Sequence, residues 1–141
     1  MEYLYFLLQL ILALILGWAI GWQRGQIGKA AGPRTYALVC IGSTLFTILS
    51  KQAFDGADTG KVAAQIITGI GFLGAGIILH KKDTVVGLTT AAGLWAISAV
   101  GMAIGTGWLI PAIMTSIIIF IVLSINDGDK PKKKANIDTK R

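Results

Sequence analysis

The stretch of this sequence that most resembles a chemical site is "GIGFLGAG", residues 69–76, where Gly69, Gly71 and Gly74 follow the pattern G-x-G-x-x-G. In dinucleotide-binding proteins this pattern joins a strand to a helix, and an acidic residue about 20 positions later binds the ribose. Here the glycines lie inside one apolar run, and Leu94 occupies the position 20 residues after Gly74. Small residues let helix backbones approach closely in a bilayer, so we interpret the glycines as a packing seam.

The other polar residues do not suggest catalysis. Asp55 and Asp58 could attract a hydrated divalent cation, but two carboxylates without further oxygen ligands make a weak site. The only histidine, His80, adjoins lysines, and the only cysteine, Cys40, lies in an apolar run typical of a buried thiol. The sequence shows no nucleophile–base pair and no phosphate loop. We therefore predict no enzyme activity and no cofactor.

Basic residues gather at one predicted membrane boundary: Arg24, Lys29, Arg34, Lys81 and Lys82. They could form a cationic pocket for a lipid phosphate or an acidic partner. Alternatively, they only fix the topology and reach out to headgroups. Gly25 and Gly28 beside Arg24 favour a shaped site, because a pure topology signal needs no glycine.

The elements that would position these residues are membrane helices. The 141-residue chain is 54% hydrophobic and 14% charged, whereas soluble domains are about 25% charged. Five apolar runs approach the length of about 20 residues that a membrane crossing needs: residues 3–22, 34–50, 62–79, 87–105 and 108–125. The first run lacks the features of a cleavable signal peptide. We predict an all-α bundle of five transmembrane helices.

Charge predicts the orientation of this bundle. Lysine and arginine concentrate in the 23–33 connection, the 80–86 connection and the segment after Asn126. The opposite side of the predicted bundle has only Lys51 and Lys61, whose positive charges are offset by Asp55 and Asp58. The positive-inside rule then places the N-terminus outside and the C-terminus in the cytoplasm. We expect a transmembrane domain over 1–125 and a disordered basic tail over 126–141. The net charge of +6 fits attraction to anionic inner-leaflet lipids and requires no nucleic acid.

Small residues predict how the helices pack. Gly17, Gly21 and Gly25 form a stripe on the first helix. The third helix has two small faces, one with Gly71 and one with Gln65, Gly69 and Gly76, which predicts a central position for it. The fifth helix is bulky and is expected at the periphery. Stripes left unused within one chain could build a homodimer.

Three blocks of the sequence resemble the MgtC/SapB family of bacterial inner-membrane proteins: "GWQRGQIGKAAGPRTYALVCIGSTLF", "AAQIITGIGFLGAGIIL" and "GLTTAAGLWAISAVGMAIG". The resemblance implies a protein of the bacterial inner membrane that serves adaptation to low magnesium. It also implies that some members act by binding a membrane partner, such as ATP synthase, rather than by moving magnesium. The motif residues of the family fall on Arg24, Gly32, Arg34, Thr35, Gln65, Gly69, Gly71, Gly74, Gly76, Gly87, Thr90, Ala91, Ala92 and Trp95.

The sequence departs from the family pattern at two positions. Gly25 stands where the family commonly has glutamate, and Thr89 stands where virulence-type members often have asparagine. Only 16 residues follow Ile125, too few for the soluble C-terminal domain of such members, so we expect a short, general member of the family.

Two functions from different classes follow. The first is a non-enzymatic protein that modulates a membrane partner or ion homeostasis through helix faces and the basic residues. The alternative is a passive transporter or channel for a cation such as magnesium, or for a lipid. Transport would need a continuous polar path through Gln65, Thr68 and the "GLTTAA" segment. No predicted span has a charged residue at its centre, which argues against a pump.

Overall fold

The computed structural model describes residues 1–52, 59–81 and 84–125. This part of the chain forms five α-helices: α1 (Glu2–Gln26), α2 (Pro33–Gln52), α3 (Thr59–Ile77), α4 (Leu88–Thr106) and α5 (Leu109–Ser124). Five helices are therefore confirmed at the predicted positions, with ends that differ by a few residues. The predicted tail, 126–141, lies outside the described residues.

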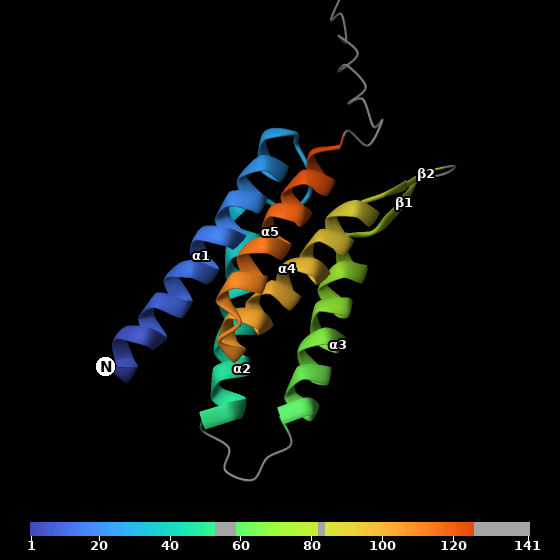
Figure 1. The fold of residues 1–141 in the computed structure, drawn as a ribbon. Helices are drawn as coiled ribbons and strands as arrows, with labels where there is room; N and C mark the ends of the chain where they lie inside the picture. The colour runs from blue at the N-terminus through green and yellow to red at the C-terminus, as the bar shows by residue number, and fades with distance from the viewer. Residues whose placement is uncertain (53–58, 82–83, 126–141) are drawn as a thin grey trace, which may run out of the picture.

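Consecutive helices run in opposite directions, up and down the bundle (Figure 1). Helices α1, α3 and α5 end where α2 and α4 begin, and we call this end of the bundle the Arg24 end. The connections that the charge pattern placed on one side of the membrane, 23–33 and 80–86, both lie there.

A short β-hairpin joins α3 to α4 and departs from the all-α prediction. Strand β1 (Leu79–Lys81) pairs antiparallel with β2 (Thr84–Val86), with Leu79 opposite Val86. The β-branched residues of β2 favour an extended backbone. Gly87 then returns the chain to α4 with a φ of 94°, a conformation that glycine adopts without steric cost. The apolar run that was predicted to continue the third helix therefore ends as a strand.

Helix α4, not α3, occupies the centre of the bundle. Of its apolar span 56% is buried, against 11% for α3, which packs mainly on α4 at the edge (Figure 1). The core gathers around α4, with Leu94, Ile97, Val100 and Ile104 all at most 1% exposed. The prediction of a central third helix is wrong, because small residues permit close packing without specifying which partner uses them.

Three helices of the described chain are long and apolar enough to cross a membrane: Glu2–Gln26, Gly60–Ile77 and Leu88–Thr106. Helix α5 is apolar but shorter, with 16 residues. Only Ala112, Ser116 and Leu123 of α5 are buried, which confirms its expected place at the periphery. These features are those of a helical membrane protein.

Candidate functional site at the Arg24 end

Arg24 lies in the last turn of α1 and is 1% exposed, although it was predicted at the membrane boundary. Its Nη1 donates to the backbone oxygen of Leu123, 3.3 Å away, in the last turn of α5. The carbonyls of a last helical turn have no partner within the helix and carry partial negative charge. Arg24 therefore binds the C-terminal end of α5 with a positively charged donor.

The rest of the guanidinium is not paired. Nε and Nη2 of Arg24 are buried and have no hydrogen-bond partner. Glu2, the one carboxylate side chain among the residues that the structure describes, lies in the first turn of α1. At 1.5 Å per residue it stands about 33 Å along the helix from Arg24. A buried, unpaired charge is costly, and a charged residue inside a membrane protein is a candidate functional site by default.

Tyr36 of α2 completes the surroundings of Arg24. Its side chain is fully buried, its hydroxyl donates to the backbone oxygen of Thr90 at 3.4 Å, and it interacts electrostatically with Arg24. Gly93 of α4 lies directly against this hydroxyl, so that an added Cβ would collide with it. We call Arg24, Tyr36, Thr90, Gly93 and Leu123 the Arg24 node. Four helices meet there: α1, α2, α4 and α5.

A second link between α1 and α5 lies beside the node. The Nε2 of Gln23 donates to the Oγ of Ser124 at 2.7 Å, while the Oε1 of Gln23 is buried without a partner. Gln23 and Arg24 thus leave one acceptor and two donors unused at neighbouring positions.

The sequence analysis missed Tyr36, Gly93 and Leu123. A signal was present for Tyr36, because a tyrosine inside an apolar run needs a hydrogen-bond partner once buried. The pairing of Tyr36 with Gly93 and of Arg24 with Leu123 joins residues far apart in the chain, and no local pattern marks it.

The predicted basic residues do not share one environment. Arg34 is exposed at the start of α2 and Lys29 is half-buried in the α1–α2 connection, whereas Arg24 is enclosed. Lys81 belongs to β1, and its side chain lies outside the described part. Lys82, Asp55 and Asp58 also lie outside the described residues. Among the residues that the structure describes, no group of His, Cys, Asp and Glu side chains could hold a metal ion.

Glycines of the first helix lie against α2 at the predicted stripe. A Cβ on Gly17 would stand 2.7 Å from the Cα of Ala37, and one on Gly21 would stand 2.6 Å from the Cα of Pro33. Gly25 has more room, since an added Cβ would stand 3.4 Å from the Cδ of Pro33, and a Cβ added to Gly32 would meet no atom within 4 Å.

The remaining motif residues are dispersed around α3 and α4. Gly74 packs on Ala91, with 3.4 Å between an added Cβ and the Cβ of Ala91, while a Cβ added to Gly69, Gly71 or Gly76 would meet no atom within 4 Å. The "GIGFLGAG" glycines are thus mostly unused by this chain. The other motif side chains range from buried to exposed: Thr90 is buried, Thr89 half-buried, and Thr35, Gln65 and Trp95 are exposed.

Several polar side chains in the interior form hydrogen bonds between helices, although the buried Ser50 Oγ in the last turn of α2 has no partner. The hydroxyls of Ser43 and Ser98 join α2 to α4 at 2.9 Å, and Thr44 Oγ1 donates to the backbone oxygen of Gly101 at 2.9 Å. Gln9 of α1 similarly donates to the backbone oxygen of Ile104. These hydrogen bonds hold the helices together. The buried side chains that form them do not make a continuous polar path.

Comparison with known proteins identifies the family. A sequence profile of the MgtC family matches residues 10–128. The chain is 44% identical over 128 residues to the "Putative magnesium transporter YhiD" of Escherichia coli K12, covering 85% of this chain and 60% of that protein. It is 43% identical over 114 residues to "Protein MgtC" of Salmonella typhimurium, covering 81% of this chain and 49% of that protein.

"Protein MgtC" of Brucella abortus is 43% identical over 94 residues, with 67% of this chain and 40% of that protein covered. The chain therefore spans about half the length of the curated relatives it matches. No solved structure matches it. The profile match covers most of the chain and three relatives exceed 40% identity, and so this protein belongs to the MgtC family.

Proposed function

We propose that this protein serves magnesium or membrane-energy homeostasis in the bacterial inner membrane by binding another membrane protein, without catalysing a reaction. It crosses the membrane five times, with the N-terminus outside and the Arg24 end at the cytoplasmic side. The name of the E. coli K12 relative, which describes a putative magnesium transporter, supports the link to magnesium. The family resemblance suggests the ATP synthase as one such partner.

The observation that carries this proposal is the contrast between the hydrogen-bonded polar groups that join α2 to α4 in the interior and an incompletely paired Arg24. Ser43, Ser98 and Thr44 are tied into contacts between helices. The charged side chains of the described helices stand near helix ends: Glu2, Arg24, Arg34, Lys51 and Lys61. Such an interior supports contact with a partner better than passage of a hydrated ion.

The Arg24 end supplies the contact with the partner. Arg34 is exposed there and is free to meet an acidic side chain or a lipid phosphate at the partner's surface. Arg24, held by Leu123, fixes the end of α5 and contributes an enclosed positive charge behind that surface. Arginine suits this role because its planar fork binds carboxylate and phosphate oxygens in pairs.

Growth of a deletion strain in low magnesium tests the proposal. Arg34→Ala should abolish complementation while the protein still inserts, because Arg34 forms no described hydrogen bond whose loss would unfold the chain. Arg34→Lys keeps the charge but not the fork and should complement in part. Lys61→Ala, which removes an exposed charge at the opposite end of the bundle, is the matched control and should complement fully. Full complementation by Arg34→Ala would contradict the role of the Arg24 end.

Passive transport of magnesium is the second candidate, because the printed name of the E. coli relative describes a putative magnesium transporter. A path would have to use Gln65 and Thr68, which are exposed on α3, together with the threonines at the start of α4. The Thr68 hydroxyl, however, donates to the backbone oxygen of Ala64 in its own helix. Magnesium flux across the membrane of vesicles that contain the purified protein distinguishes the two functions, because only the transporter should raise it above that of protein-free vesicles.

A further inference from the structure

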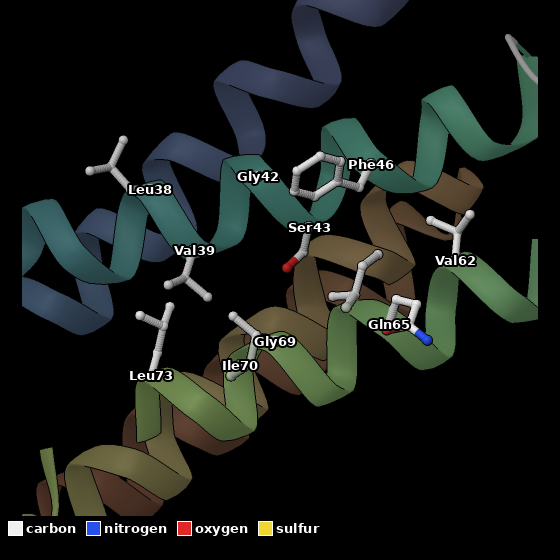
Figure 2. A pocket seen from close by; sticks show the side chains of 11 residues that line it. Leu38, Val39, Gly42, Ser43, Phe46, Val62, Gln65, Gly69, Ile70 and Leu73 are labelled. Carbon is white, nitrogen blue, oxygen red and sulfur yellow. The ribbon is translucent and has the colours of Figure 1, made fainter. Parts of the chain in front are cut away.

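An open groove of about 560 Å³ runs between α2 and α3 on the outside of the bundle. Its walls are apolar side chains such as Leu38 and Phe46 of α2 and Leu73 of α3 (Figure 2). The two helices touch little, because α3 rests mainly on α4. The groove therefore faces whatever surrounds the protein in the membrane.

Gln65 of α3 is a polar residue in this apolar groove (Figure 2). Its side chain is exposed and forms no hydrogen bond with the described part of the chain. It stands six residues into α3, about 9 Å along the helix, and so within the hydrocarbon of a spanning helix. A carboxamide without a hydrogen-bond partner is unfavourable in hydrocarbon, and an acyl chain offers it none.

Glycines on both walls of the groove are left open. A Cβ on Gly42 of α2 or on Gly69 of α3 would meet no atom within 4 Å. At Gly17, Gly21 and Gly105, in contrast, an added Cβ would come within 2.8 Å of a neighbouring helix. Glycine destabilises a helix relative to alanine unless close packing compensates. Packing within the chain compensates Gly17, Gly21 and Gly105, whereas Gly42 and Gly69 have no such compensation from the described part of the chain.

We propose that a second copy of this chain docks on the groove, with α3 of the two copies packed at Gly69 and their Gln65 side chains hydrogen-bonded to each other. This proposal does not depend on whether the protein regulates a partner or transports an ion.

A second copy fits the groove for three reasons. A carboxamide both donates and accepts, so Gln65 is its own complement across a two-fold axis. Copies inserted with the same topology place Gln65 at the same depth. The residues that line the groove carry no charge, so symmetric approach brings no like charges together.

The test measures the monomer–dimer equilibrium of labelled full-length protein in lipid vesicles, by single-molecule photobleaching over a series of protein-to-lipid ratios. Gln65→Leu should weaken the dimer about 10-fold, the loss expected for two interhelical hydrogen bonds in a membrane. Gly69→Ile should abolish the dimer by blocking close approach. Neither substitution should lower helix content measured by circular dichroism, because neither site packs within one chain.

Two matched variants act as controls. Gly71→Ile adds the same bulk at another open glycine, but two residues along a helix rotate it about 200° from Gly69. Thr115→Leu removes an exposed polar side chain from α5. Both should dimerise like the unchanged protein.

A protein that stays monomeric at every ratio would overturn the proposal and leave the groove to lipid or to a different protein. Dimers that tolerate both Gln65→Leu and Gly69→Ile would overturn it as well, since they would use another face. Magnesium flux or its absence would change neither conclusion.

Discussion

The Nη1 of Arg24 and the backbone oxygen of Leu123, 3.3 Å apart, join the last turn of α1 to the last turn of α5. A charged donor thus holds a helix end whose carbonyls lack partners within the helix. Because Nε and Nη2 stay unpaired, the charge is only partly compensated. The Arg24 node therefore combines a structural contact with an unsatisfied charge.

Replacing Arg24 should separate stability from function. Arg24→Met keeps most of the side-chain volume, loses one hydrogen bond and removes a buried, incompletely paired charge. A buried charge without an ion-pair partner carries an uncompensated desolvation cost, and replacing even a buried ion pair with apolar residues of similar volume is often neutral or stabilising by about 1–4 kcal/mol. We expect an unchanged or higher midpoint of thermal unfolding in detergent, together with loss of complementation in low magnesium. A fold that collapses in this variant would make Arg24 purely structural.

The glycines of the first and third helices should respond in opposite ways to alanine. Gly21→Ala places a methyl group 2.6 Å from the Cα of Pro33, where the backbone must move. Overpacking of this kind costs about 1–3 kcal/mol. Gly71→Ala meets nothing within 4 Å and gains helix propensity of up to about 1 kcal/mol. The unfolding of the two variants, measured in detergent micelles that keep the protein monomeric, gives the difference in stability. Equal stability would contradict the packing described for α1 and α2.

Gly93 and Tyr36 should show coupled energies. Gly93→Ala forces the Tyr36 hydroxyl away from its place beside α4, and we expect a loss of about 1–3 kcal/mol. Tyr36→Phe removes that hydroxyl and should restore part of the stability in the double variant. A double-mutant cycle measures this coupling. Independent, additive effects would mean that the two residues do not meet as described.

The hydroxyl pair between α2 and α4 should contribute modestly. Ser43→Ala and Ser98→Ala each break the 2.9 Å contact, and interhelical hydrogen bonds in membrane proteins average about 0.6 kcal/mol. The second substitution should cost little once the first is present. Unfolding of both single variants and the double variant tests this, and a coupling near zero would show that the contact contributes nothing.

Local sequence features predicted the helices because an apolar run of sufficient length has few other structures available in a membrane. They failed at the hairpin, where Leu79 extended an apolar run but the β-branched residues of β2 favoured pairing. The position of α3 was also mispredicted. Gly69 and Gly71 predict close packing with another helix. Their spacing does not show whether that helix belongs to the same chain or to another molecule.

The candidate site was only partly predictable for a related reason. A basic residue at the end of an apolar run usually reaches the headgroups, so the sequence could not distinguish the enclosed Arg24 from the exposed Arg34. Their difference arises from Tyr36, Gly93 and Leu123, which the fold brings to Arg24 from three other helices.

Magnesium flux tests the central claim most directly. Purified protein is placed in vesicles that contain a magnesium-sensitive dye, with the membrane potential recorded in parallel and the fold verified by circular dichroism. The closed interior predicts that the vesicles show no more flux than protein-free vesicles, for the unchanged chain and for Gln65→Leu alike. Saturable flux that disappears in Gln65→Leu would contradict the account and make this protein a transporter.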